Sequence, residues 1–154
     1  MTDYAHNHDR PFWVGVDFDG TCVIAGEKYP EIIGDMPGAV AGLREIVKAG
    51  GALLLITSRE GKDLKEAVKW FEKHEIPLAG VNENPDPFWA GHRKIYCDVL
   101  IDDRTVGFPT TYLSSSYRNV ADWPFILDGV LQAMVKQKVD RLENARKFEV
   151  GGEV

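Results

Sequence analysis

The sequence predicts an α/β protein with a Rossmann-like parallel sheet and helices on both of its faces. Short, continuously apolar segments, typical of strands buried on two sides, alternate with longer segments in which apolar residues recur every three to four positions. This alternation is typical of right-handed βαβ units. The expected strands are residues 12–16, 52–56, 78–81 and 99–101, and the expected helices are residues 37–49, 64–71 and 127–142.

Local signals mark where these elements end. Two glycines, Gly50 and Gly51, stop the first helix, and the second helix ends before Pro77. Residues 82–93 are rich in proline and aromatic side chains, so we expect a loop with one helical turn at most. The strand at 78–81 has a weaker signal than the first two.

We expect one domain over residues 12–146, because a chain of 154 residues has the usual size of a single domain. A flexible tail is predicted at residues 1–11 and a loose one at 147–154. Residues 22–36 are long enough only for a short β-hairpin flap. Neither this flap nor the loop at 82–93 can form an independent cap domain, since chains under about 40 residues rarely bury enough core. We therefore expect an open site unless another subunit covers it.

The composition excludes several classes of protein. Eighteen basic and 24 acidic residues give a net charge of -6, which argues against duplex nucleic acid as the partner. The two cysteines, Cys22 and Cys97, cannot form a disulfide scaffold, so we expect a reduced, cytoplasmic protein. No apolar run approaches the roughly 20 residues that span a bilayer, so no membrane partner is expected. A homo-oligomer is compatible with these features.

Polar side chains follow three of the predicted strands directly. These side chains are Asp17 and Asp19, then Thr57, Ser58 and Arg59, then Asp102 and Asp103. Ligands of open parallel sheets bind beyond the carboxyl ends of the strands, so we expect these groups to share one crevice. Carboxylates that lie close together raise one another's pKa unless a cation lies among them. A hard divalent cation fits such a site, and Mg²⁺ suits carboxylates combined with phosphate and water.

Four segments also resemble the motifs of one known family. Residues 14–21, an apolar strand followed by Asp-Phe-Asp-Gly-Thr, resemble the first motif of the haloacid dehalogenase-like (HAD) superfamily. Thr57, Lys94 and the pair Asp102-Asp103 are similar to its second, third and fourth motifs, and residues 93–104 resemble small capless phosphatases of that superfamily. The resemblance implies a Rossmann-like core, dependence on Mg²⁺ and an aspartyl-phosphate intermediate.

The chemistry of phosphate transfer assigns a role to each of these groups. Asp17 is expected to be the nucleophile, and Asp19 the general acid for the leaving oxygen and then the base for water. Thr57 would hold a phosphoryl oxygen, while Lys94 would neutralise Asp17 and the developing charge. Dehalogenases of the superfamily generally lack an acid at the position of Asp19, so its presence favours phosphate over halide.

Two further groups of residues are expected around this centre. The predicted metal ligands are Asp17, Asp19 through its backbone carbonyl, Asp102 and, as a direct or an outer ligand, Asp103. The predicted substrate contacts are Gly20, Ser58, Arg59, His92 and Arg93. For the three basic residues of this group, a solvated loop charge is the alternative.

The sequence therefore predicts an Mg²⁺-dependent phosphatase that hydrolyses a phosphate monoester, on a small molecule or on a larger phosphorylated substrate. A receiver domain is disfavoured, because Asn82 and not an aspartate follows the third strand. A mutase or phosphotransferase is also disfavoured, because it usually needs a cap to exclude water and no cap is expected here. Two alternatives stay open: a nucleic-acid or nucleotide end-processing phosphatase, and a non-enzymatic phosphate-binding or signalling module of the same fold.

Overall fold

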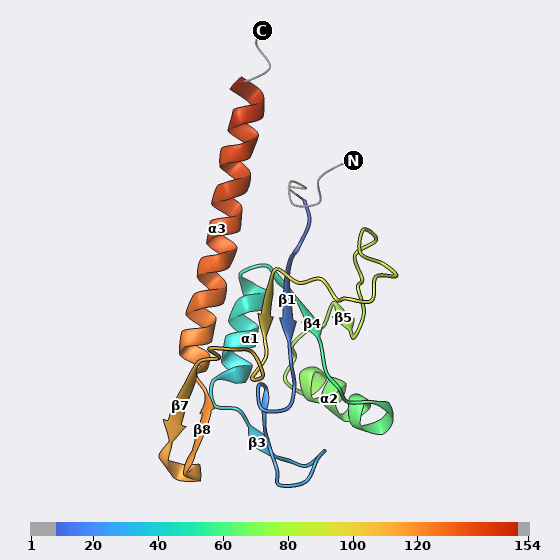
Figure 1. Ribbon diagram of the computed structural model, residues 1–154, viewed down its shortest axis with the longest axis vertical. Coiled ribbons are helices and arrows are strands. Elements are labelled where there is room, and N and C mark those ends of the chain that lie inside the picture. The colour runs from blue at the N-terminus through green and yellow to red at the C-terminus, as the bar shows by residue number, and fades with distance from the viewer. Residues whose placement is uncertain (1–8, 151–154) are drawn as a thin grey trace.

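The computed structural model of the chain describes residues 9–150 and is built around a four-stranded parallel sheet (Figure 1). The strands are β1 (Phe12–Val16), β4 (Gly51–Leu55), β5 (Gly80–Val81) and β6 (Val99–Ile101). Their order across the sheet is β5-β4-β1-β6, and every neighbouring pair is parallel. The four expected strands are thus present, although β5 is shorter than the expected 78–81. β1 and β4 hold the two inner positions, and β1 is buried along its whole length.

Three helices pack on one face of this sheet. They are α1 (Ala39–Lys48), α2 (Gly61–Lys73) and α3 (Trp123–Val150). Their buried side chains share one cluster with Val14 and Leu53, which point to the same side of the sheet. The steps from β1 to β4 and from β4 to β5 run in the same direction across the sheet, so right-handed crossovers place α1 and α2 on the same face.

The expectation of helices on both faces is wrong for the part of the chain that the structure describes. The connection from β5 back to β6 is the crossover that reaches the second face, and it contains no helix. Its residues cover that face as a loop: the Cys97 sulfur lies at Gly15, and the Pro85 ring lies beside Gly80 and Leu54. The segment lacks helical periodicity and is rich in proline, so it forms the loop that the sequence predicts at residues 82–93, and no helix covers the second face.

Two β hairpins lie at the carboxyl end of the sheet. The first comprises β2 (Val23–Ala25) and β3 (Ile32–Asp35), which pair in antiparallel fashion within the segment 22–36. The second comprises β7 (Thr110–Leu113) and β8 (Arg118–Ala121), joined by the short helix η2 (Ser114–Ser116). The second hairpin was not predicted from the sequence. Figure 1 shows both hairpins at the end of the molecule toward which β1 points.

Both expected domain boundaries differ from the structure. Arg10, placed in the flexible tail 1–11, is buried and forms an ion pair with Asp98 at 2.7 Å. Residues 147–150 of the tail 147–154 belong to α3, which begins before the expected 127–142 and ends after it. Residues 1–8 and 151–154 of the two tails lie outside the described part of the chain.

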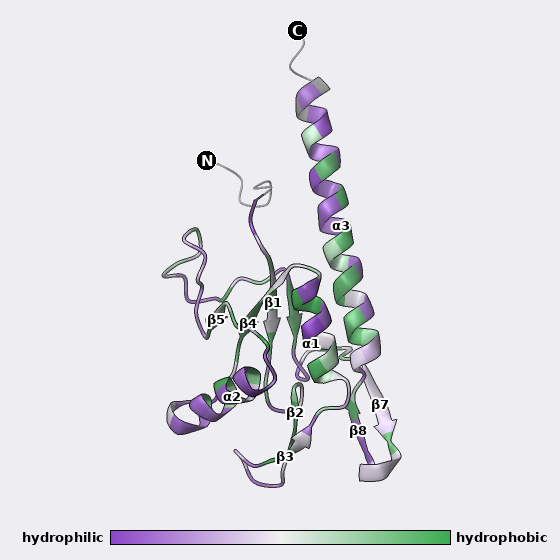
Figure 2. Cartoon of the chain, turned by 180° about the vertical axis from the view of Figure 1, so that it is seen from behind, coloured by the Kyte–Doolittle hydropathy of each residue, from purple (hydrophilic) through white to green (hydrophobic). Residues whose placement is uncertain are grey.

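The first half of α3 closes the core, and its second half projects beyond the sheet (Figure 1). The buried side chains described for this helix are Trp123, Ile126, Val130 and Met134. The colouring in Figure 2 shows that hydrophilic residues predominate along the projecting half. None of the described helices combines the length and the apolar character that crossing a bilayer requires.

Candidate functional site

Three aspartates that follow β1 and β6 converge at the carboxyl end of the sheet. One carboxylate oxygen from each of Asp17, Asp102 and Asp103 lies within 4.8 Å of the other two. The register explains the convergence, because Val16 and Ile101 are direct partners in the sheet and the chains leave it side by side. The N–H of Asp17 also donates to the Ile101 carbonyl at 2.9 Å. Adjacent parallel strands thus deliver three acids to one point.

Asp17 is the most perturbed acid of this cluster. Burial is the main cause that raises its pKa to about 7, and the charges of Asp102 and Asp103 raise it further. The N–H of Phe18 and the hydroxyl of Thr21 oppose this shift, since both donate hydrogen bonds to Asp17. Burial followed by the charge of Asp102 likewise raises the pKa of Asp103. Such a cluster is short of positive charge, and a cation placed among these acids would lower both pKa values.

The turn after β1 fits tightly against the turn after β6. The fully buried Thr21 hydroxyl donates to Asp17 at 3.3 Å and accepts from the N–H of Asp103 at 3.2 Å, so one side chain joins the two turns. Gly20 has a φ of +77°, and a Cβ there would collide with the carboxylate of Asp103. Glycine is therefore required at position 20 both for its backbone conformation and for its small size. Position 20 shapes the site even though it offers no side chain.

Asp19 is held by Arg59 and lies outside the three-acid cluster. The guanidinium donates to both oxygens of Asp19, at 2.8 and 2.7 Å, and to Glu66 at 3.1 Å. It also donates to the Pro30 carbonyl at 2.7 Å and lies 4.9 Å from the ring centre of Phe18. The hydrogen bond to Asp19 is the main cause that raises the pKa of Arg59.

Arg59 was expected as a substrate contact, with a solvated loop charge as the alternative, and its burial contradicts that alternative. Its side chain is 0% exposed. Through its hydrogen bonds it joins Asp19 to Pro30, which lies in the segment 22–36.

Thr57 lies after β4 and is held by a residue that sequence reasoning did not single out as functional. The Asn82 side chain accepts from the N–H of Thr57 at 2.8 Å and donates to its carbonyl at 2.8 Å. The N–H of Asn82 in turn donates to the Leu55 carbonyl at 2.8 Å. Asn82 thus continues the pairing of β4 with β5 beyond the strands. The sequence did contain a signal for Asn82, because it is a polar residue that directly follows a strand at the carboxyl edge of the sheet.

The hydroxyl of Thr57 accepts a hydrogen bond from the N–H of Arg59 at 3.2 Å, and this bond closes a local turn of the chain. The neighbouring Ser58 is exposed.

The structure does not bring Lys94 to the three acids. Lys94 is exposed on the loop before β6, and no ion pair among the described residues joins it to Asp17. Together with His92, Arg93 and Cys97 it lines a cavity of about 600 Å³ beside this loop. The pKa of Cys97 is raised mainly by burial, and the charge of Lys94 acts against that shift. The three basic residues of the loop thus share this cavity, and none of them forms an ion pair with the acid cluster in the described part of the chain.

Comparisons with known proteins include a match to a solved structure. No protein-family model and no curated protein matches the chain. A solved structure, described as that of a conserved protein coded by a locus from Bacteroides thetaiotaomicron, matches with a TM-score of 0.62 and 31% sequence identity. The match covers 84% of this chain and 93% of that one. The chain therefore belongs to the same family as this conserved Bacteroides protein.

Proposed function

We propose that the protein is an Mg²⁺-dependent phosphatase of the HAD type, which hydrolyses a phosphate monoester through an aspartyl-phosphate on Asp17. The observation that carries the proposal is the convergence of Asp17, Asp102 and Asp103 where β1 and β6 end. Three partly buried carboxylates, which form no ion pair within residues 9–150, make a donor set of hard oxygens, although the charge of Arg104 acts on Asp103. Such a set fits Mg²⁺.

The residues of this site divide the chemistry between them. Asp17, Asp102 and Asp103 would hold the ion, which supplies positive charge to the carboxylates and to the phosphoryl oxygens. Asp17 attacks the phosphorus and the leaving oxygen departs, so that one P–O bond forms as another breaks. Water then cleaves the acyl-phosphate and releases inorganic phosphate. Thr57, whose backbone is held by Asn82, would donate its hydroxyl to a phosphoryl oxygen.

General acid catalysis by Asp19 requires a rearrangement of its contacts. Both of its oxygens accept hydrogen bonds from Arg59, so Asp19 must leave the guanidinium before it can protonate a leaving group. This pairing is also the observation that favours the second candidate, a non-enzymatic phosphate-binding module of the same fold. Hydrolysis measurements separate the two candidates.

The test is hydrolysis of an aryl phosphate near neutral pH, with Mg²⁺ and with excess EDTA. We expect turnover that requires Mg²⁺ and that is lost in Asp17→Asn, because the nucleophile is removed. Asp128→Asn makes the same chemical change at an exposed position on α3, so it should keep wild-type turnover and control for contaminating phosphatases. Equal turnover of Asp17→Asn and Asp128→Asn would exclude the covalent mechanism, and unchanged activity in EDTA would exclude the metal.

The role of Asp19 is read from its dependence on the leaving group. In single turnovers, Asp19→Asn should slow release of an alkyl alcohol much more than release of an acidic phenol, which needs little proton assistance. If release of all leaving groups slows equally, Asp19 is a positioning residue rather than the general acid.

A further inference from the structure

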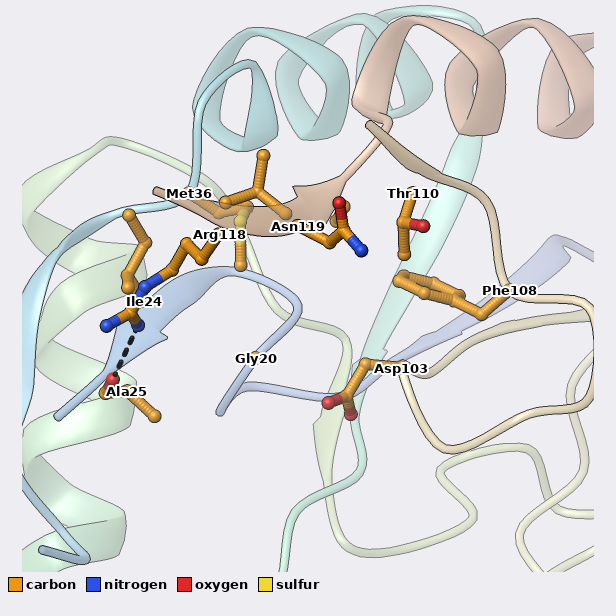
Figure 3. Close-up of a pocket in the computed structure, with 11 residues that line it drawn as sticks. Gly20, Ile24, Ala25, Met36, Asp103, Phe108, Thr110, Arg118 and Asn119 are labelled. Carbon is orange, nitrogen blue, oxygen red and sulfur yellow. Dashed lines mark hydrogen bonds between the residues drawn. The ribbon is translucent and has the colours of Figure 1, made fainter. Parts of the chain in front are cut away.

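A cavity of about 250 Å³ opens beside the acid cluster, between the two hairpins (Figure 3). Gly20 and Asp103 form one side of it, so the cavity borders the acid cluster through Asp103. The opposite side comes from β8, which contributes Arg118 and Asn119. Figure 3 shows Asp103 and Arg118 on opposite sides of the open space. A phosphate monoester bound at Asp17 therefore has this cavity beside it.

The walls of the cavity suit a small, partly apolar molecule. Apolar side chains from the β2–β3 hairpin, from β8 and from the loop before β7 line it: Ile24, Ala25, Met36, Phe108, Val120 and Ala121. The polar groups Thr110 and Asn119 lie exposed at its mouth. A cavity with mostly apolar walls and few polar groups is the usual form of a site for a small organic ligand.

Arg118 supplies positive charge to this cavity without a matching acid. Within residues 9–150, no carboxylate forms an ion pair with it, and its hydrogen bond to the Ala25 carbonyl is long, at 3.4 Å. This differs from Arg59, whose guanidinium is buried and pairs with two acids. A guanidinium donates well to carboxylates and phosphates because its geometry matches theirs. Arg118 can therefore exchange a weak contact with the flap for a strong contact with an anion.

We infer that the cavity between the hairpins binds the alcohol half of the substrate and that Arg118 binds a second anionic group on it. The inference rests on the proposed function, since it names the substrate class for the same site: phosphate monoesters of small alcohols that carry a carboxylate or a second phosphate. The cavity volume of about 250 Å³ lies just below the roughly 300–1,000 Å³ that is usual for drug-sized ligands, so it suits a small alcohol.

The test measures binding rather than turnover, so it gives a result whether or not the protein is a phosphatase. Asp17→Asn protein with Mg²⁺ is titrated calorimetrically with phosphate monoesters of ω-hydroxy acids containing two to five carbons. Each ligand is paired with the diol monophosphate of equal length, in which a hydroxyl replaces the carboxylate. The series of lengths finds the reach to Arg118, and α,ω-bisphosphates of the same chains show which anion is preferred.

For at least one chain length we expect the anionic ligand to bind about tenfold more tightly than its neutral partner, as a charge-assisted hydrogen bond implies. Arg118→Gln should abolish this preference, and Arg118→Lys should keep part of it. Lys138→Gln removes the same charge from an exposed position on α3 and should keep the preference in full. No preference at any length, or a preference that survives in Arg118→Gln, would overturn the inference.

Discussion

Replacing Asp17 by asparagine should make the metal-free protein more stable at alkaline pH. The raised pKa means that the folded state holds a proton on Asp17 more tightly than the unfolded state does. The wild-type free energy of unfolding should therefore fall as the pH rises from about 4 to about 7, and stay low above that. Asparagine cannot ionise, so the variant escapes this loss.

The size of the gain follows from the shift itself. A pKa raised from 3.8 to about 7 is a change of about 3 units, and each unit corresponds to about 1.36 kcal/mol. The full value is about 4 kcal/mol, but Asp17 is only partly buried, and solvent screening reduces such effects. We therefore expect Asp17→Asn to be about 2 kcal/mol more stable than wild type at pH 8, with the difference vanishing near pH 4.

Urea unfolding in EDTA at several pH values, followed by the fluorescence of the four tryptophans, measures this difference. Added Mg²⁺ should shrink the difference, because the ion stabilises the wild type through binding to the folded state. Asp98→Asn is the matched control of opposite sign. Burial favours the neutral form of Asp98, but hydrogen bonds from Arg10 and from the N–H of Trp13 outweigh it and lower the pKa.

The ionised Asp98 stabilises the folded state at every pH above the pKa that it has in the unfolded chain, and this stabilisation is lost only as the pH falls through its lower pKa in the folded state. Asp98→Asn should therefore lower the free energy of unfolding by about 3–5 kcal/mol throughout pH 5–8. An Asp17→Asn protein no more stable than wild type at pH 8 in EDTA, or one whose advantage does not depend on pH, would refute the assignment of Asp17 to a crowded acidic site.

Three further substitutions probe the surroundings of the acids. Arg59→Met leaves two carboxylates without their cation and should lower the free energy of unfolding by about 3–5 kcal/mol in urea; a loss under 1 kcal/mol would mean that the pair is not buried in solution. Gly20→Ala should weaken the rise in Tm caused by Mg²⁺, because the new Cβ displaces Asp103; an unchanged Mg²⁺ titration would contradict this contact. Asn82→Ala removes both hydrogen bonds to the Thr57 backbone and should lower kcat for the aryl phosphate about ten- to hundredfold, whereas wild-type kcat would show that Thr57 needs no such support.

The central part of the fold could be predicted because its signals are local. The strands and the first two helices each carry their pattern within a few residues, and the carboxyl edge of a parallel sheet then places Asp17 near Asp102. The β7–β8 hairpin lacked such a signal. Its turn ends at Tyr117, which has a φ of +50°, whereas glycine or asparagine is the usual mark of that conformation.

The parts of the site that were not predicted depend on side-chain packing or on the path of a loop. Arg59 and Asp19 are 40 residues apart, and only the folded core decides that the guanidinium is buried against the acid rather than exposed to substrate. Lys94 sits in a connection without periodicity, so its motif-like position in the sequence did not determine where its side chain lies. The sequence shows that Lys94 precedes β6, but it does not show which groups the Lys94 side chain contacts.

The hydrogen bond from the Trp123 indole to the Thr21 carbonyl, 2.8 Å long, has a consequence for the timing of synthesis. The two residues are 102 positions apart, and ribosomes add about 5–20 residues per second. The turn that carries Asp17 therefore emerges roughly 5–20 s before the tryptophan that supports it. Asp102 and Asp103 also follow long after Asp17, so a nascent chain holds the proposed nucleophile before the other two acids of the cluster exist. Activity should thus appear only when the first turn of the last helix has left the ribosome.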